Sequence, residues 1–198
     1  MSCLERKCDE WYTFLSRLEP GDIILCAGLL DLNNPPSYSQ LRHVKQFAVP
    51  ESYAFPTNDI ALLKLDAPFD FAESKGHIGA VCLPAKDRPL EGEVEVAGWG
   101  ATAPDEPSSP HLLAVSIPVT SPPCFGIFDK KVMFCAGSPG KDSCPGDSGG
   151  PVMKEDSGSS ILVGVVSGGG PCGVEPGFNT RVPAFTEWIS ENIVKLRQ

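Results

Sequence analysis

The stretch Asp142-Ser143-Cys144-Pro145-Gly146-Asp147-Ser148-Gly149-Gly150-Pro151 sets a serine between an acid and two glycines. Gly146 and Gly149 lack a Cβ, so the backbone beside Ser148 can turn tightly and approach a ligand closely. In such a turn the N–H groups of Gly146 and Ser148 can converge on the oxyanion of an attacked carbonyl. The stretch therefore predicts a nucleophilic Ser148. Asp, Ser, Gly and Pro are also the residues of ordinary turns, so this interpretation needs support from the rest of the chain.

The composition is that of an ordinary globular protein with frequent turns. Of 198 residues, 41% are hydrophobic and 21% are charged, and Gly and Pro number 20 each. The many turn residues favour short strands over long helices. A formal net charge of −9 argues against a basic surface that binds nucleic acid, and it offers no basic patch for an anionic membrane. No apolar run approaches the length of a membrane span. We therefore expect no nucleic-acid partner and no membrane partner.

Cysteine usage indicates an oxidising compartment, because the sequence contains eight cysteines. None of them forms a Cys-x2-Cys pair, so a zinc site is not expected. Residues 1–20 are polar and lack the apolar segment of a signal peptide. Extracellular cysteine usage without an export signal leads us to expect a chain that is incomplete or unusual.

Short apolar or alternating runs, separated by turn residues, predict a series of strands. A connector over residues 84–92 divides the expected strands into a first group of three and a second group of six. One apolar stripe over residues 184–197 predicts a C-terminal helix, with Pro183 suited to its first turn. Residues 11–18 also space their apolar side chains as a short amphipathic helix would. The expected strands are Ile23–Leu30, His43–Val49, Ile60–Leu65, Glu93–Gly98, Leu112–Val119, Val132–Ala136, Pro151–Met153, Ile161–Val166 and Gly177–Val182.

Further motifs supply the context that the serine stretch needs. In chain order they are Asn58-Asp59-Ile60-Ala61-Leu62-Leu63, Val81-Cys82-Leu83-Pro84, Ala97-Gly98-Trp99-Gly100, Phe134-Cys135-Ala136-Gly137, Val166-Ser167-Gly168-Gly169 and Pro176-Gly177-Phe178-Asn179-Thr180-Arg181-Val182. With the serine stretch, these motifs resemble the trypsin/chymotrypsin family of serine endopeptidases in family order. The resemblance covers about residues 22–196.

The resemblance implies an all-β fold of two antiparallel β-barrels followed by a C-terminal helix. We expect an unassigned segment over residues 1–21 and a protease domain over 22–198. Within that domain, a partial first barrel would occupy residues 22–83, the second barrel 93–182 and the helix 184–197. Only the last three strands of the first barrel are present in the sequence, so its edges and apolar faces should be exposed.

The resemblance assigns two members of a Ser-His-Asp triad. Ser148 matches the nucleophile, Asp59 the acid that orients the base, and Ser167 the serine that supports this acid. The oxyanion hole would be formed by Gly146 and Ser148.

The triad base has no counterpart. The family carries it in an Ala-Ala-His-Cys motif, and the place where that motif would fall reads Met1-Ser2-Cys3. The chain's own histidines are expected to be surface or partly packed residues, because a base must reach both of its partners. They are His43, His77 and His111.

The predicted specificity pocket has an acidic floor. Asp142 lies six residues before Ser148, and an acid at this position selects Arg or Lys in the family. Gly169 and Gly177 match the small wall residues that admit a long cationic side chain. The alternative for Asp142 alone is an acid in a solvated loop, and the two matching glycines favour the pocket over it. Two aromatic walls of the family pocket are replaced, by Gly168 and Asn179.

Asp147 matches the acid that, in active family members, pairs with an N-terminal ammonium released by cleavage. The Ile-Val-Gly-Gly-like sequence that supplies this ammonium is absent from the chain, so we expect Asp147 to lack its partner.

The cysteines match two family disulfides, Cys124–Cys135 and Cys144–Cys172. Another family pair is replaced by Val94 and Lys154, whereas Cys3, Cys8, Cys26 and Cys82 have no assigned partners. Family calcium loops carry Glu where this chain has Leu29, so we expect neither a metal nor a cofactor.

The expected function is that of a trypsin-like serine endopeptidase acting on polypeptides after Arg or Lys, outside the cell, with polypeptide substrates or protein inhibitors as partners. Without the histidine and the activating N-terminus, we expect little catalysis by the chain itself. The alternative is a non-catalytic homologue that acts by binding partners.

Overall fold

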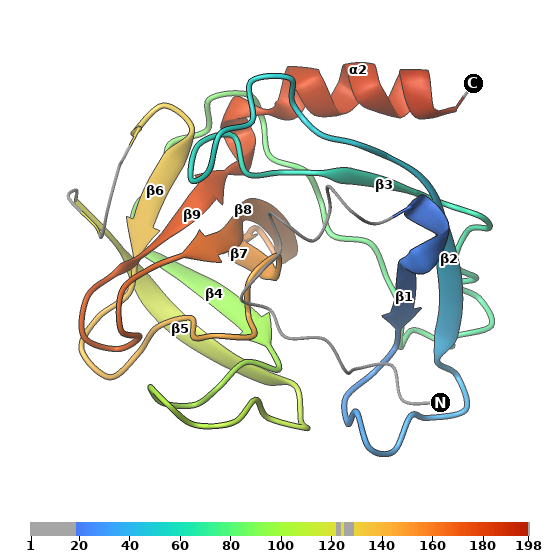
Figure 1. Ribbon diagram of the computed structural model, residues 1–198, viewed down its shortest axis with the longest axis horizontal. Coiled ribbons are helices and arrows are strands. Elements are labelled where there is room, and N and C mark those ends of the chain that lie inside the picture. The colour runs from blue at the N-terminus through green and yellow to red at the C-terminus, as the bar shows by residue number, and fades with distance from the viewer. Residues whose placement is uncertain (1–18, 122–123, 125–128, 198) are drawn as a thin grey trace.

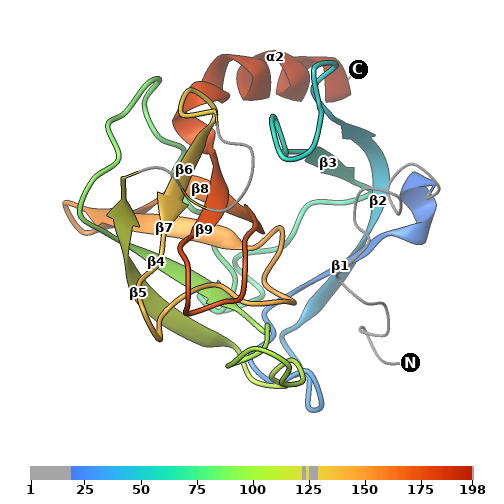
Figure 2. The same cartoon turned by 60° about the vertical axis from the view of Figure 1, so that its left-hand side comes forward.

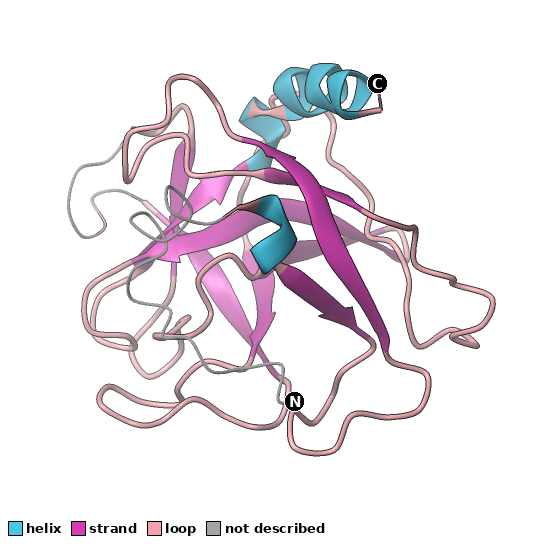
Figure 3. Cartoon of the chain, turned by 45° about the vertical axis from the view of Figure 1, so that its right-hand side comes forward, coloured by secondary structure: helices cyan, strands magenta, loops and turns pink. Residues whose placement is uncertain are grey.

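A computed structural model describes residues 19–121, 124 and 129–197. Strands dominate this part of the chain, as the colouring in Figure 3 shows. No helix within it is long and apolar enough to cross a membrane. The elements are η2 (Pro20–Asp22), β1 (Ile24–Ala27), β2 (Gln40–Ala48), β3 (Leu62–Leu65), β4 (Glu93–Gly98), β5 (Leu113–Thr120), β6 (Met133–Ala136), β7 (Pro151–Asp156), β8 (Ser159–Gly168), β9 (Gly177–Arg181), η3 (Val182–Ala184) and α2 (Thr186–Leu196).

Strands β4 to β9 close into an antiparallel barrel in the order β4-β5-β6-β9-β8-β7. Strand β4 illustrates the alternation that builds this barrel. In Glu93-Val94-Glu95-Val96 the valines are buried and the glutamates are exposed, as expected for a strand with one face in the core. The core cluster is drawn from β4, β5, β6, β7 and β8, namely Val94, Val96, Ile117, Phe134, Ala136, Val152, Val163 and Val166. The prediction of an all-β fold with a complete second barrel is confirmed.

Strands β1, β2 and β3 form a separate three-stranded antiparallel sheet. Figure 1 shows this sheet on the right and the barrel on the left. Strand β1 pairs only with β2 among the described residues, and Ile24 and Leu41 are 47% and 53% exposed. The sheet corresponds to the expected incomplete first barrel.

Helix α2 is one element that contacts both the sheet and the barrel. Ile189 of α2 is buried with Val182 and Phe185, and Leu62 of β3 packs against the same cluster. The helix runs over both halves of the molecule in Figure 2. At another point of contact, the N–H of Leu112 donates to the carbonyl of Leu30 at 2.8 Å.

Several element ends differ from the sequence prediction. Strand β1 stops at Ala27 because Gly28 adopts a positive φ of 82° and turns the chain. Strand β7 does not end at Met153 but continues to Asp156, where Ser157 and Gly158 (φ 51° and 78°) lead into β8. Two positive φ values in succession are typical of a tight hairpin turn. Helix α2 begins at Thr186 and not at residue 184, because Pro183 lies in the preceding 3-10 helix η3. The amphipathic segment predicted at 11–18 lies outside the described residues.

Candidate active site

The serine turn is held by its own backbone and by strand β8. The N–H of Asp147 donates to Cys144 (3.0 Å), that of Gly150 donates to Asp147 (2.8 Å), and that of Gly149 donates to Val166 in β8 (2.8 Å). Gly146 and Gly149 have positive φ values of 102° and 81°, which side chains other than glycine rarely adopt.

The N–H groups of Gly146 and Ser148 have no acceptor within the described residues. Gly146 has a second reason to be glycine, because a Cβ there would lie 2.9 Å from the Cα of Gly100 and from Oγ of Ser108. The turn therefore leaves two backbone donors unused, at Ser148 and two residues before it, and unused donors are one requirement of an oxyanion site.

The Asp147 carboxylate accepts hydrogen bonds from two backbone amides, one within the serine stretch and one just after β4. Its Oδ1 accepts the N–H of Gly100 at 2.8 Å and its Oδ2 accepts the N–H of Cys144 at 2.9 Å. A Cβ at Gly98 would lie 2.1 Å from Oδ1, and one at Gly100 would lie 2.5 Å from the carboxylate. The two glycines of the Gly98-Trp99-Gly100 motif therefore leave the space that this carboxylate fills, a role that the sequence analysis did not assign to them.

A cavity of about 420 Å³ borders Asp147, and Gly98, Gly100, Asp142 and Val174 also line it. No Lys or Arg within the described residues forms an ion pair with Asp147.

Asp59 sits between the two halves of the molecule. Its Oδ2 accepts a hydrogen bond from Oγ of Ser167 in β8 at 2.6 Å, and its backbone carbonyl accepts one from Oγ1 of Thr180 in β9 at 2.6 Å. Asn58, with a positive φ of 58°, shapes the backbone before it, a conformation that Asn tolerates better than most residues. Burial raises the pKa of the Asp59 carboxyl, and the Ser167 hydrogen bond opposes that rise. Oδ1 of Asp59 accepts no hydrogen bond from the described residues.

The three histidines of the sequence lie in the described part of the chain, and none contacts Asp59 or Ser148. His43 lies on β2, His77 stacks on Tyr38 with ring centroids 3.9 Å apart, and Nδ1 of His111 is 3.8 Å from Asp31. The structure therefore places none of them as the base of a triad.

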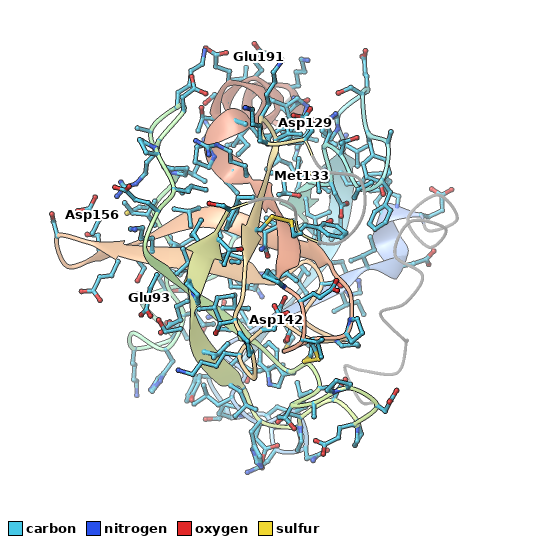
Figure 4. The ribbon with its side chains drawn as sticks, turned by 90° about the vertical axis from the view of Figure 1, so that its left-hand side faces the viewer. Glu93, Asp129, Met133, Asp142, Asp156 and Glu191 are labelled. Atoms are coloured by element: carbon cyan, nitrogen blue, oxygen red, sulfur yellow. A yellow bond between two sulfur atoms is a disulfide. The ribbon has the colours of Figure 1, made fainter. Side chains whose placement is uncertain are left out.

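Asp142, labelled in Figure 4, lines the same cavity as Cys144 and Asp147 of the serine turn. Its Oδ1 accepts the N–H of Ser143 at 2.8 Å, and its Oδ2 accepts that of Gly173 at 3.3 Å. A Cβ at Gly177 would lie 3.3 Å from Oδ1, and a Cβ at Gly169 would lie 3.1 Å from the Cα of Gly177. Gly177 is therefore a neighbour of Asp142 on one side and of Gly169 on the other.

Burial is the main cause of a raised pKa of the Asp142 carboxyl. Hydrogen bonds from the backbone of Gly173, Ser143 and Gly177 oppose the rise, and the nearby charge of Asp147 adds to it. A guanidinium or ammonium ligand beside this half-buried carboxyl would favour its ionised form and so oppose the rise in its pKa.

Both predicted disulfides are present. Cys144 and Cys172 join the serine turn to the loop before β9 with a Cα–Cα distance of 5.2 Å, and Cys124 and Cys135 lie 5.7 Å apart between their Cα atoms. Cys82 is an exposed free thiol within the described residues, whereas Cys3 and Cys8 lie outside them.

One aromatic contact near the predicted pocket was not anticipated. Gly168 leaves no room for a side chain, because a Cβ would lie 2.8 Å from Cζ of Phe178. The ring of Phe178 also meets that of Phe55 edge to face at a centroid distance of 6.2 Å. An aromatic pair therefore lies beside Gly168, although the family's aromatic residue at that position is absent. The contact depends on the register of β8 and β9, which pairs Gly168 with Phe178 and has no local signal in the sequence.

Comparison with known proteins decides the family. The family model described as Trypsin matches residues 23–189, most of the chain. The chain belongs to the trypsin family. Among the described residues of this trypsin-family chain, no three His, Cys, Asp or Glu side chains are grouped to hold a metal ion.

Curated relatives agree with this assignment. Trypsin-1 of Astacus astacus is 36% identical over 188 residues, which cover 88% of this chain and 77% of that protein. The proclotting enzyme of Tachypleus tridentatus is 34% identical over 83% of this chain and 46% of its own length. The serine proteinase stubble of Drosophila melanogaster is 36% identical over 77% of this chain and 21% of its own length. The chain thus spans less than half of these last two relatives.

The contact between Gly98 and Asp147 generates a stability prediction. Gly98→Ala should lower the free energy of unfolding by about 1–3 kcal/mol, because the new methyl group overlaps the Asp147 carboxylate. The same substitution should cost much less in an Asp147→Ala background, since the overlap is then removed. Urea denaturation of the four proteins in this double-mutant cycle measures the coupling.

Gly79→Ala is the matched control, because nothing lies within 4 Å of a Cβ at that position. Equal costs of Gly98→Ala with and without the Asp147 carboxylate would contradict the contact.

The raised pKa of Asp59 generates a pH prediction. A carboxyl whose pKa is higher in the folded state than its ordinary value of 3.8 contributes stability at low pH that is lost as the pH rises through the folded-state pKa. The stability of Asp59→Asn relative to wild type should therefore increase from about pH 3.8 upward, until the wild-type carboxyl is fully ionised. Urea unfolding at a series of pH values measures this difference.

Glu51→Gln, which removes an exposed carboxylate, should give a difference from wild type that changes little over the same range. If the stability of Asp59→Asn relative to wild type stays constant or falls with rising pH, burial does not raise the pKa of the Asp59 carboxyl.

Proposed function

We propose that the chain carries the substrate-recognition and nucleophile side of a trypsin-like serine endopeptidase site, which takes the Arg or Lys side chain of a polypeptide at Asp142. The observation that carries the proposal is the half-buried Asp142 carboxylate against Gly177, which is itself next to Gly169, six residues before Ser148. A guanidinium entering there would form a charge-assisted pair with the carboxylate. The wall glycines would leave space for the long methylene stem.

Ser148 would be the nucleophile for the peptide bond that follows this residue. Its Oγ attacks the carbonyl carbon while a base removes the hydroxyl proton, and the N–H groups of Gly146 and Ser148 stabilise the resulting oxyanion. Collapse of the intermediate expels the amine, which takes up the proton, and water then hydrolyses the acyl-enzyme. Oδ1 of Asp59 is the acceptor available to orient the base.

The base is the missing component. All three histidines are held elsewhere, and loss of the base of a serine triad lowers kcat by about 10⁶. Residual acceleration from oxyanion stabilisation and binding is about 10³–10⁴-fold over water. We therefore propose that residues 1–198 alone hydrolyse peptides only slowly.

Asp147 would be the partner of an activating ammonium. Its carboxylate borders the cavity of about 420 Å³ and lacks a cationic partner among the described residues. A cation placed there would pair with a carboxylate that already binds the N–H groups of Gly100 and Cys144, and would thus hold the oxyanion turn more firmly.

A second candidate function is a non-catalytic module that binds polypeptides or protein inhibitors through the Asp142 pocket. The observation that favours it is the placement of His43, His77 and His111 away from Asp59 and Ser148. For either function we propose an extracellular location, where the two disulfides would be stable.

A fluorophosphonate probe and an Arg ester separate the two functions. We expect residues 1–198 to show little Ser148-dependent turnover, because no base is available to activate the hydroxyl. The measurements are labelling detected by mass spectrometry and ester hydrolysis, each compared with Ser148→Ala. Labelling at Ser148 with turnover near that of ordinary trypsin-like enzymes would contradict the binding-module proposal and assign the role of base to another residue.

Peptide binding tests the pocket independently of turnover. In a Ser148→Ala background, a peptide containing Arg should bind more tightly than the same peptide with Leu, and Asp142→Ser should remove that difference. Calorimetric titration measures both affinities. Glu175→Gln, which removes an exposed acid near the pocket in sequence, should keep most of the preference. An Arg preference that survives Asp142→Ser would overturn the assignment of Asp142.

A further inference from the structure

Between β3 and β4 the chain passes from the sheet to the barrel, and the first part of this passage is fastened to the sheet. The N–H of Asp70 donates to Oε1 of Gln40 on β2 at 2.8 Å, and Nε2 of Gln40 donates to the carbonyl of Asp70 at 2.7 Å. Further along, the ring of His77 stacks on that of Tyr38 with centroids 3.9 Å apart. Residues 66–78 therefore belong to the sheet half of the molecule.

The second part of the passage, which begins at Cys82, is fastened to the barrel. The N–H of Cys82 donates to the carbonyl of Ser160 at 3.1 Å, and the carbonyl of Cys82 accepts the N–H of Leu162 at 2.9 Å. Further along, Nη2 of Arg88 forms an ion pair with Oδ2 of Asp156 on β7 at 2.6 Å. This part of the chain must therefore move with the barrel.

Residues 79–81 lie between these two fastened parts and form no backbone hydrogen bond with the described residues. All three are exposed, whereas Ile78 before them is buried. Nothing lies within 4 Å of a Cβ at Gly79, and glycine has the widest backbone freedom of any residue. A few loop residues of this kind can absorb the backbone rotations when two halves of a protein turn against each other.

Apolar packing and a loop contact hold the halves together in addition to the chain itself. Ile60 and Leu62 on the sheet side pack against the same cluster as Val165 of β8. Apolar burial is non-directional, so such a cluster tolerates a small rotation of one half. The backbone bond from Leu112 to Leu30 joins two loops, which are more mobile than strands.

Asp59 makes a directional contact between the halves. Its carboxylate accepts a hydrogen bond from Oγ of Ser167 on β8, and its carbonyl accepts one from Oγ1 of Thr180 on β9, each at 2.6 Å. Hydrogen bonds weaken steeply as their geometry departs from the optimum, so both bonds break when the sheet turns away from the barrel. The two bonds are thus the contact that distinguishes a closed arrangement from an open one.

We infer that residues 79–81 form a hinge about which the sheet, with Asp59, turns against the barrel, with Ser148, and that the two hydrogen bonds of Asp59 are the latch that holds the closed arrangement. The distance between Asp59 and Ser148 is then set by the latch and not by the path of the chain. The inference does not rest on the proposed function, because the movement occurs whether or not the site is catalytic.

Methyl relaxation-dispersion NMR on the intact 198-residue chain tests the hinge, because hinge movements of this kind occur in microseconds to milliseconds. The latch variant combines Ser167→Ala with Thr180→Val, which removes both donors. Gly79→Pro in the latch variant stiffens the hinge, because proline fixes φ. Ala85→Pro is the matched control, since it lies in the part fastened to the barrel and its N–H donates no backbone bond to the described residues.

We expect the latch variant to raise the open population about tenfold or more over wild type, because two bonds that favour the closed arrangement are lost. The methyl groups of Ile60, Leu62 and Val165 should then exchange at one common rate. Gly79→Pro should suppress this exchange and Ala85→Pro should leave it unchanged. Val163, which is 0% exposed in the barrel core, should show none.

The opposite change at the hinge is a second test, which decides the matter if Gly79→Pro does not fold. Insertion of two glycines after Ala80 in the latch variant should increase the exchange. Absence of exchange in the latch variant, or exchange that neither hinge change alters, would overturn the inference. The same exchange rate at Val163 would also overturn it, because the process would then be unfolding of the barrel.

Discussion

The carboxylate of Asp147 is the interaction on which the candidate site depends. It accepts the N–H groups of Gly100 and Cys144 and fits against the Cα atoms of Gly98 and Gly100. These contacts join the start of the serine turn to the end of β4, so the turn cannot move without breaking hydrogen bonds to a half-buried carboxylate. The unused N–H groups at Gly146 and Ser148 are presented by a turn anchored in this way.

A second constraint joins the sheet to the barrel at Asp59. This residue belongs to the segment before β3, yet Ser167 and Thr180 of the barrel bind its carboxylate and its carbonyl. Asp59 and Asp142 are both buried enough to raise the pKa of their carboxyls, and the charge of Asp147 adds to the rise at Asp142. Asp142 and Asp147 carry like charge, so a cationic ligand or partner at Asp142 would offset their repulsion.

Local pattern and family resemblance predict most of the architecture and the pairing of the cysteines, whereas contacts between residues distant in sequence leave no local pattern. Alternation in Glu93-Val94-Glu95-Val96 marks a strand without outside information, and motif order pairs Cys144 with Cys172. The space that Gly98 and Gly100 leave for Asp147 has no local signature, because those residues are distant in sequence. The contact of Phe178 with Gly168 likewise arises from the register of β8 and β9.

Amide hydrogen exchange in Asp147→Asn tests most directly whether the Asp147 carboxylate holds the serine turn. We expect faster exchange than in wild type at Gly100 and Cys144, which donate to the carboxylate, and also at Gly149 and Gly150, which donate to backbone carbonyls around the turn. Amides in the β6–β9 ladder should be unchanged. Faster exchange confined to Gly100 and Cys144, with Gly149 and Gly150 protected as in wild type, would show that the backbone alone maintains the turn and that the Asp147 carboxylate does not.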